Sequence, residues 1–463
     1  MKSGLKTIFI PIFQGVEARN VLRTDVVKKI LEYGDSRVVF FVSSSDKKNY
    51  YEREFGNNDN MIFEVFNDYK PSFLERFLGI LKVHAFRSKT MDNKRLLELE
   101  KSKNSVRYYR SLIWNRFMSR PLIRYILRFL DYYFVRKEHF RYFFEKHHPD
   151  LVFLGHLFGD TEVAMLREAK RRSIPSVGLV NSWDKLTSRC MLRILPGYLF
   201  VPNGITYEEA NAYHDVPYQS IVITGAPQFD MYFNRKFVSR DQFCRSLNIR
   251  EDYKIILVCP IGKTFSTSDW RILELLEKFY LEGKIPTKLH FVVRFPPNDI
   301  VEEKKPLDAK LFTFQKPGIR FSNKRGVDWD FSESDLDSLG NSVASADLII
   351  PFWSTMNIDG AILDKPLIAV DFDIEGGVII DGSFYQYQSV HYKKIKETGA
   401  VTVVKDPDMF CKAINYYLEH PDYHRQERYF MVKDQLYRMD GKAGEYIASL
   451  LRRLLFFKSL PKA

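Results

Sequence analysis

Short apolar runs alternate with helical patterns along most of this chain. In the first half the runs are KTIFIPIF, SRVVFFVSS, MIFEVF, DLVFLGH, SVGLVN, GYLFVPN and SIVITG. Helical patterns separate several of them; one covers residues 21–33 and ends at Gly34, a residue type that often terminates helices. Strands that alternate with helices are typical of β-α units and parallel sheets. The pattern therefore predicts an α/β fold.

A second set of runs follows a charged connection near residues 234–252. Its members are KIILVCP, LHFVVRFPP, DLIIPF, PLIAVDF and AVTVV. A chain of 463 residues also exceeds what one hydrophobic core usually supports. We therefore predict two Rossmann-like domains with sheets of similar size, facing a cleft. The N-terminal domain covers residues 1–230, the C-terminal domain covers residues 231–440, and a basic helical tail covers residues 441–463.

Residues 71–148 of the N-terminal domain have a different character, because no strand pattern is visible and basic residues interleave with Phe, Tyr and Trp. Pro121 suits the first position of a helix, on which Arg120, Arg124 and Arg128 share one face. We interpret the segment as a helical insertion. Two interpretations of its surface stay open: an interface that meets anionic lipid head groups, or a layer packed on the domain with a solvated basic face.

The net charge of +12 favours an anionic partner. A phosphate-bearing substrate and an anionic membrane surface fit, whereas nucleic acid is disfavoured because no RNA- or DNA-binding module is visible. The four cysteines are far apart, which argues against a disulfide framework or a metal site. The first apolar run is short and broken by Pro11, and no window resembles a membrane span. We expect a cytoplasmic protein, peripheral on the inner face of the membrane.

Polar residues follow the predicted strands of the N-terminal domain. In α/β sheets, ligands bind in the crevice at the carboxyl ends of the strands. The stretch GHLFGDTE supplies His156, Asp160 and Glu162 at one such end. The next strand is followed by NSWDKLTS, and the loop after the first strand contains FQGVEARN. From these two segments we select the cleft residues Ser182, Trp183, Asp184, Lys185, Thr187 and Glu17.

A transfer to a hydroxyl group needs a general base beside that hydroxyl. Asp160 and His156 are the first candidates, followed by Asp184 and Glu17. Each has a structural alternative: Asp160 could cap the helix that follows it, and the run around Asp184 could be a loop cap anchored by Trp183.

The strongest pattern in the C-terminal domain is SADLIIPFWSTMNIDGAILDKPLIAVDFD. Ser354 and Thr355 stand where a helix should begin, and the free N–H groups and hydroxyls of such a position suit a phosphate or diphosphate. The alternative is that Ser354 only caps the helix. Asp359 either contacts the donor or is a solvated carboxylate of the first helical turn.

Two further strand ends of this domain carry polar residues. Arg294 in LHFVVRFPP could clamp a phosphate with two hydrogen bonds, or form a structural ion pair. The loop VCPIGKTFS places Gly262, Lys263 and Thr264 after the first strand. It is not a P-loop, because the glycine spacing is absent; a phosphate-facing loop and an ordinary turn both stay open.

These segments together resemble the GT-B glycosyltransferases, particularly bacterial surface-polysaccharide transferases and transferases of the CDP-glycerol glycerophosphotransferase type. The similarity covers roughly residues 150–373, and NSWDKLT followed by VITGAPQFD resembles a run in the polysaccharide enzymes. It implies that Ser354 and Thr355 hold the donor's phosphates and that Asp359 contacts its sugar or ribose. The chain departs from the pattern where Pro296 replaces a histidine and Lys185 an asparagine.

The resemblance implies a glycosyltransferase that moves a sugar from a nucleotide-sugar donor to a growing, lipid-linked surface polysaccharide. The scheme requires no metal and no cofactor, since the nucleotide sugar is itself a substrate. Three alternatives stay open: a CDP-glycerol-type glycerophosphotransferase, a nucleotide-sugar 2-epimerase, and a non-catalytic scaffold for polysaccharide assembly.

Overall fold

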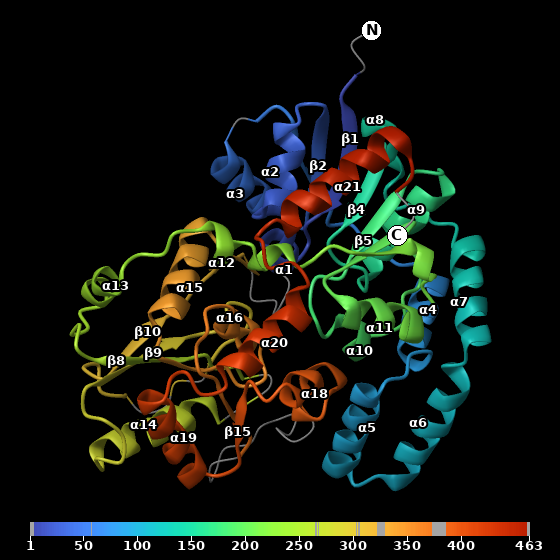
Figure 1. The fold of residues 1–463 in the computed structure, drawn as a ribbon. Helices are drawn as coiled ribbons and strands as arrows, with labels where there is room; N and C mark the ends of the chain where they lie inside the picture. Colours follow the sequence, from blue (N-terminus) through green and yellow to red (C-terminus); the bar gives the residue numbers. More distant parts are fainter. Residues whose placement is uncertain are drawn as a thin grey trace. The chain divides into compact units, whose positions relative to one another are not determined.

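A computed structural model describes residues 4–56, 58–263, 266, 268–301, 303, 306–321, 329–372 and 386–460. The chain divides into two compact units (Figure 1). Unit 1 consists of Met1–Asp230 and Leu436–Ala463, and unit 2 consists of Met231–Gln435. The segment 441–463, expected to be a separate tail, is thus part of unit 1.

Unit 1 is built on a parallel sheet that contains seven strands within the described residues. Their order is β3-β2-β1-β4-β5-β6-β7, so the direction of the winding reverses between β1 and β4. The strands match the apolar runs of the sequence, which confirms the predicted α/β fold. Their bounds are β1 (Lys6–Pro11), β2 (Ser36–Val42), β3 (Met61–Val65), β4 (Leu151–Leu154), β5 (Ser176–Leu179), β6 (Tyr198–Val201) and β7 (Ile221–Ile223).

Both faces of this sheet are covered, because successive side chains of a strand point to opposite faces. On one face, Phe9 packs edge-on against Phe41 and Phe144, with ring centroids 4.8 and 5.2 Å away. On the other face, Ile8 and Ile10 join a separate core. The helices of this unit outside the insertion are α1 (Gly15–Glu17), α2 (Asp25–Glu32), α3 (Ser45–Phe55), α9 (Asp160–Arg171), α10 (Lys185–Ser188), α11 (Gly204–His214) and α21 (Ala443–Phe457).

Helix α21 packs against α2 (Figure 1) and contributes Ile447, Leu451 and Leu454 to the second core. Its first turn is fixed by Asp230, whose carboxylate accepts hydrogen bonds from the N–H groups of Gly444 at 2.7 Å and Ala443 at 3.2 Å. A carboxylate at a helix N-terminus pairs otherwise unsatisfied N–H groups and complements the helix dipole.

The insertion consists of α4 (Phe73–His84), α5 (Lys89–Ser102), α6 (Ser105–Met118), α7 (Pro121–Phe134) and α8 (Arg141–His147). Pro121 is the first residue of α7, as predicted. Two arginines of the basic face predicted on α7 are paired with a carboxylate. Arg124 and Arg128 both donate to Asp215, at 2.7 and 2.8 Å. Among the described residues, no helix is long and apolar enough to cross a membrane.

Within the described residues, the main sheet of unit 2 has four parallel strands in the order β10-β9-β8-β13. A parallel pair, β14-β15, is linked to them by a bridge between Ile349 and Leu367. The strands are β8 (Lys254–Val258), β9 (Leu289–Arg294), β10 (Phe312–Gln315), β13 (Leu348–Ile350), β14 (Ile368–Val370) and β15 (Thr402–Val404). The short antiparallel pair β11 (Ile319–Arg320) and β12 (Trp329–Asp330) was not predicted.

The helices of unit 2 follow the predicted alternation. They are α12 (Met231–Asn234), α13 (Arg240–Ser246), α14 (Asp269–Leu281), α15 (Glu333–Ser345), α16 (Met356–Ile362), α18 (Val390–Glu397), α19 (Pro407–Glu419) and α20 (Arg425–Leu436). Strands β8, β9, β13 and β14 pack with α14 and α19 in one core that includes Leu273, Phe291 and Phe410. The winding reverses between β8 and β13.

Candidate functional site

Each unit has a point where its winding reverses, and crevices at such points bind ligands in doubly wound sheets. In unit 1 the loops that follow β1, β4 and β5 are tied together there. The side-chain amide of Asn20 donates to the carbonyl of Asn181 at 2.6 Å, and the amide of Asn181 donates to the carbonyl of Gly155 at 2.5 Å. Glu17 lies against Gly155, where an added Cβ would be 3.6 Å from its Cβ and Cγ.

Glu17 is completely buried at this edge. Its Oε2 accepts the N–H of Gln14 at 2.7 Å, whereas Oε1 has no hydrogen-bond partner among the described residues. Lys47, on α3, is also buried and donates from Nζ to the carbonyl of Phe13 at 2.9 Å. The loop after β1 therefore holds a carboxylate close to an ammonium group, both shielded from water.

Glu162 is the second buried carboxylate of this edge. It lies in the first turn of α9, and a Cβ added to Gly159 would come within 2.0 Å of its Oε2. Gly159 is therefore required for this placement. Burial raises the pKa of Glu17 well above its ordinary value, and Glu162 raises it further. Burial likewise raises the pKa of Glu162, and Asp160 adds to that effect.

His156 and Lys185 are the cationic candidates of the same edge. Both are buried, and Nδ1 of His156 has no hydrogen-bond partner among the described residues. Burial lowers the pKa of His156 well below its ordinary value, and the charge of Lys185 lowers it further. The imidazole is therefore neutral. Burial also lowers the pKa of Lys185, whereas Asp184 opposes that effect.

The loop after β5 is only partly accessible. Ser182, Trp183 and Asp184 are half-buried, and Thr187 is fully buried. Asp184 accepts hydrogen bonds from the hydroxyls of Ser182 at 2.6 Å and Ser188 at 3.0 Å. The hydroxyl of Ser88 donates to the carbonyl of Thr187 at 2.5 Å. Asp184 is thus a half-exposed carboxylate held by hydroxyls, whereas Thr187 is part of the packing against α5.

Asp160 belongs to a network of ion pairs with the helical insertion. It pairs with Lys82 of α4 at 2.7 Å and with Arg193 at 3.0 Å. Arg193 also bonds Asp131 of α7 at 2.6 Å, and Asp131 in turn pairs with Arg167 of α9. The cap position of α9 is Gly159, so Asp160 does not cap that helix. Its contacts make it a link between α9 and the insertion.

In unit 2 the loop after β8 is shaped by glycine. Gly262 has φ of +94°, and an added Cβ would lie 2.6 Å from Asp299. Its N–H donates to the buried carboxylate of Asp269 at 2.7 Å. Burial raises the pKa of Asp269 to about 6. Lys263 has an exposed side chain, and Thr264, the third residue predicted for this loop, lies outside the described residues.

Arg294 is buried at the end of β9 and is surrounded by acceptors. Its guanidinium donates to the side chains of Gln315 at 3.0 Å and Ser338 at 3.1 Å, and to the carbonyl of Asp335 at 2.9 Å. These partners are uncharged, so Arg294 ties β9 to α15 without an ion pair at these three contacts.

The turn between β13 and α16 is strained. Phe352 has φ of +50°, a conformation that is unfavourable for a residue with a bulky side chain. The carbonyl of Phe352 accepts hydrogen bonds from the amide of Asn357 at 2.8 Å and the hydroxyl of Tyr392 at 3.2 Å. Strained turns of this kind cluster at functional sites.

The hydroxyl pair predicted to hold phosphates is in this turn. The Ser354 hydroxyl donates to the carbonyl of Pro351 at 2.7 Å and accepts the N–H of Met356 at 3.3 Å. Thr355 is the cap residue of α16 and makes no side-chain cap bond. Asp359 is fully buried and accepts the hydroxyl of Tyr232 at 2.7 Å, so it is not the solvated carboxylate considered from the sequence.

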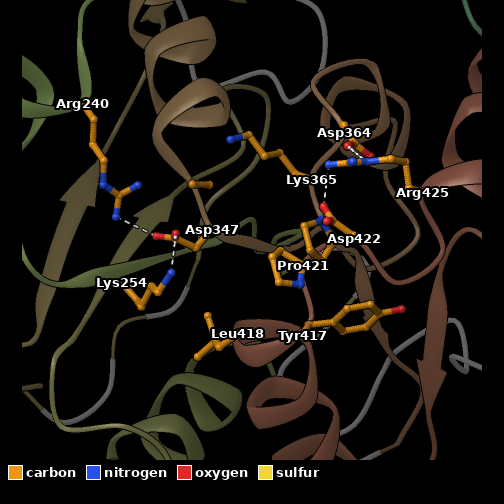
Figure 2. Close-up of a pocket in the computed structure, with 12 residues that line it drawn as sticks. Arg240, Lys254, Asp347, Asp364, Lys365, Tyr417, Leu418, Pro421, Asp422 and Arg425 are labelled. Atoms are coloured by element: carbon orange, nitrogen blue, oxygen red, sulfur yellow. Dashed lines mark hydrogen bonds and ion pairs between the residues drawn. The ribbon is translucent and has the colours of Figure 1, made fainter.

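A pocket of about 160 Å³ lies elsewhere in unit 2, where β8 and β13 begin (Figure 2). Several of its charged side chains are paired. Asp347 bonds Arg240 at 2.7 Å and Lys254 at 3.4 Å, and Arg425 bonds Asp364 at 2.6 Å. The pocket is at the edge of the sheet opposite to the Gly262 and Ser354 loops, and four basic and three acidic side chains line it.

The sequence did not single out Lys47, and it did not select Glu162 as a site residue. Both lie near the start of helices, where a charged side chain usually faces solvent. One feature of the sequence could have drawn attention to Glu162. It is the third residue of α9, three residues after the cap residue Gly159, and a glutamate at this position often reaches back toward the start of its helix.

Two solved structures resemble this chain in fold over nearly its whole length. One is a UDP-N-acetylglucosamine 2-epimerase, at 13% identity and a TM-score of 0.55, with 100% of this chain and 98% of the other covered. Another is the UDP-GlcNAc 2-epimerase from Neisseria meningitidis, at 12% identity and a TM-score of 0.53, with 97% and 100% covered. The wall teichoic acid polymerase TagF is 14% identical with a TM-score of 0.48, with 99% and 90% covered.

No curated protein has a significant sequence match to this chain. A protein-family model does match, over residues 35–453, and its description is CDP-Glycerol:Poly(glycerophosphate) glycerophosphotransferase. The match spans far more than half of the chain, and it begins after the loop that holds Glu17. The chain therefore belongs to the CDP-glycerol:poly(glycerophosphate) glycerophosphotransferase family.

Proposed function

We propose that this protein transfers glycerol phosphate from CDP-glycerol to the end of a growing glycerol-phosphate polymer. The observation that carries the proposal is the family match over residues 35–453. It favours the glycerophosphotransferase alternative over the sugar transfer that we expected first. A nucleotide-activated donor and a polymeric acceptor are common to both readings.

The proposed reaction exchanges one P–O bond for another. An oxygen of the acceptor's terminal hydroxyl bonds to the phosphorus that carries glycerol, and the bond from that phosphorus to the cytidine monophosphate oxygen breaks. The hydroxyl proton goes to a base, and cytidine monophosphate departs with the charge of the broken bond. The protein must therefore position an anionic donor, stabilise charge on the departing phosphate and accept one proton.

Unit 2 is our candidate for donor binding. The Gly262 loop brings backbone close to any ligand at the end of β8, and the exposed Lys263 adds a positive charge. Ser354 and Thr355 supply hydroxyls at the strained turn after β13. Arg294 sits at the end of the neighbouring strand β9. These groups follow adjacent strands of one parallel sheet, so their carboxyl ends share one edge.

Unit 1 is our candidate for acceptor binding. Asp184 is half-exposed and oriented by Ser182 and Ser188, so it can reach a substrate hydroxyl without rearrangement of the core. Trp183, next to it, offers an apolar surface of the kind that packs against a polyol chain. Lys185, buried next to Asp184 in the same loop, supplies a positive charge there, and the neutral His156 is buried after strand β4.

The helical insertion is our candidate for contact with an anionic lipid surface. On α4, α6 and α7 a set of large apolar side chains is exposed, which we call the aromatic face: Phe73, Phe77, Ile80, Tyr109, Ile113, Trp114, Phe117, Leu122, Tyr125, Ile126 and Phe129. Exposed arginines lie among them on the same helices, namely Arg76, Arg107, Arg110 and Arg116. Aromatic and basic side chains together favour an interface with anionic head groups.

Vesicle binding tests this last part. We expect Ile113→Glu with Phe117→Glu to reduce co-sedimentation with anionic vesicles. Leu281→Glu, which changes an equally exposed leucine of unit 2, should leave binding as it is. Equal binding by all three proteins would contradict the assignment.

The transfer itself is tested by release of cytidine monophosphate from CDP-glycerol. We expect release that depends on an added glycerol-phosphate oligomer and that falls strongly in the double variant Ser354→Ala, Thr355→Ala. Turnover of a nucleotide sugar but not of CDP-glycerol would refute the proposal. Conversion of a UDP-sugar without any acceptor would instead point to epimerisation.

A further inference from the structure

Five ionisable side chains are buried together at the carboxyl edge of the unit 1 sheet. Each has at most 7% of its surface exposed, and they are Glu17, Lys47, His156, Glu162 and Lys185. Removing charged groups from water costs several kcal/mol each unless they are paired and hydrogen-bonded. The edge is also the point where β1 and β4 diverge, which is where α/β sheets bind ligands.

Two atoms of this cluster lack partners. Oε1 of Glu17 and Nδ1 of His156 are buried and make no hydrogen bond within the described part of the chain. Buried polar atoms are normally satisfied, so each exception calls for an explanation. In Glu17 the other oxygen is fixed by the N–H of Gln14, so Oε1 is the oxygen left to interact with a ligand.

We propose that Oε1 of Glu17 receives the proton of the acceptor hydroxyl, with the second buried carboxyl group of this edge, that of Glu162, adjusting how readily Glu17 accepts it. This inference rests on the transfer proposed above. Glu17 is then the catalytic base, and Glu162 is a positioning residue that acts through Glu17.

The charged surroundings act on the two carboxyl groups in opposite directions. Burial raises the pKa of both, the charge of Glu162 raises the pKa of Glu17 further, and Asp160 raises the pKa of Glu162. Ammonium groups oppose these effects and favour the ionised forms, Lys47 acting on Glu17, and Lys82 and Lys185 acting on Glu162. Asp184 and Arg189 are the charges that act most strongly on Lys185.

The step is balanced. The O–H bond of the acceptor breaks as its oxygen bonds to the glycerol-bearing phosphorus, and the proton passes to Oε1 of Glu17. Cytidine monophosphate takes the electron pair of the broken P–O bond. The protonated Glu17 returns its proton to water after the product leaves. Because Oε1 is shielded from solvent, the hydroxyl must displace neighbouring side chains as it approaches, and it then meets the carboxylate without competing water.

The first experiment measures kcat as a function of pH. We expect Glu17→Gln to lower kcat by about 10²- to 10⁴-fold, the range for loss of a general base. Its KM for CDP-glycerol should be unchanged, since the donor is proposed to bind unit 2. Glu162→Gln should keep turnover but move the acidic limb of the profile to lower pH, because one negative charge beside Glu17 is gone. A purely structural role for Glu162 would not move that limb.

A matched control is available on the same helix. Glu168 of α9 is also a buried glutamate with a raised pKa, caused mainly by burial, but it binds the N–H of Phe140 away from the edge. Glu168→Gln should change neither kcat nor the pH profile. Wild-type kcat in Glu17→Gln, or an unmoved acidic limb in Glu162→Gln, would overturn the proposal.

The second experiment needs no substrate. Infrared difference spectra of the wild type, recorded across a pH titration, should contain the stretch of a protonated carboxyl group from Glu17. That component should be absent in Glu17→Gln, titrate at lower pH in Glu162→Gln, and be unchanged in Glu168→Gln. Identical spectra of the wild type and Glu17→Gln would refute the proposal even if CDP-glycerol is the donor. The expected Glu17 component together with no turnover of CDP-glycerol would refute the proposed transfer instead.

Discussion

The two polar edges of this protein are built by different means. At the unit 1 edge, carboxyl and ammonium groups are buried together, among them Glu17, Glu162 and Lys47. At the unit 2 edge, two buried charged side chains bond neutral groups: Arg294 bonds amide, hydroxyl and carbonyl oxygens, and Asp359 bonds the hydroxyl of Tyr232. The first arrangement suits proton transfer, because its charges depend on pH. The second suits the binding of an anion by a rigid turn.

The largest effect expected from this difference comes from Lys47. Replacing it by Met removes an ammonium group and leaves the buried carboxyl pair without that cation, so we expect unfolding to become easier by about 3 to 5 kcal/mol. The loss should grow as pH rises. The pKa of Glu17 in the folded state is already raised, so the folded state holds its proton to higher pH than the unfolded state, and stability falls as that proton is removed.

Urea unfolding of Lys47→Met between pH 5 and pH 8 measures this dependence. Lys48→Met is the control, since the neighbouring lysine lies at the surface and pairs with Glu52. Its stability should stay within about 0.5 kcal/mol of the wild type. A pH-independent loss in Lys47→Met would mean that only packing was changed.

A smaller effect is expected at the unit 2 turn. Asn357 is fully buried and donates to the carbonyls of Phe352 at 2.8 Å and Ser354 at 2.7 Å. Asn357→Ala leaves acceptors unpaired around a strained residue, which should cost about 2 kcal/mol. No ionisable group is lost, so the change in the free energy of unfolding should be the same across the pH range used for Lys47. A pH-dependent loss would break the contrast between the two edges.

Replacing Gly262 by Ala should lower the free energy of unfolding by about 1 to 2 kcal/mol. Its φ of +94° is unfavourable for alanine, and the new Cβ would press on Asp299. Gly283→Ala separates these two causes, because Gly283 has φ of +66° and no atom near its added Cβ. Gly262→Ala should unfold at a lower temperature than Gly283→Ala. Equal losses of stability in the two variants would exclude a role for the Asp299 contact.

The smallest change in stability is expected for Asp184→Asn. Asp184 is half-exposed, and an amide oxygen can still accept the hydroxyl of Ser182. Stability should therefore change by less than about 0.5 kcal/mol. If Glu17 is the base, kcat should fall less than about tenfold, far less than for loss of a general base. A fall as large as that of Glu17→Gln would move the role of base to Asp184.

Much of the fold follows from the sequence because long apolar runs must be buried, and strands inside a sheet that is covered on both faces bury them. KTIFIP and KIILV are first strands of their sheets and are buried on both faces. The helix predicted over residues 21–33 is interrupted, since Ala18–Leu22 forms a π-helical turn and α2 starts anew after Thr24, whose side chain caps it. The strand FTFQ of β10 was missed because a four-residue run with two polar positions does not stand out from a loop.

The sites could be predicted only in part. Asp184 and Ser354 follow predicted strands in the sequence, and this position alone places them at the carboxyl edges of the sheets. The sequence pattern does not reveal which side chains other segments will cover. Glu17 and Lys185 were expected to face a ligand and are buried, whereas Lys47 and Glu162 look like solvent-facing residues of their helices. Burial of these four depends on loops that come together from four different strands, which no local pattern encodes.

The return of the chain to unit 1 also matters for biosynthesis. Helix α21 supplies Ile447, Leu451 and Leu454 to the core that β1, β2 and α2 begin. During translation these residues emerge only after all of unit 2, about 200 residues later than Asp230. Until then that face of the sheet is covered only in part, by segments such as α2, and Asp230 has no helix to cap. The nascent protein therefore exposes part of an apolar core while its second half is made, a period in which chaperone binding would be most useful.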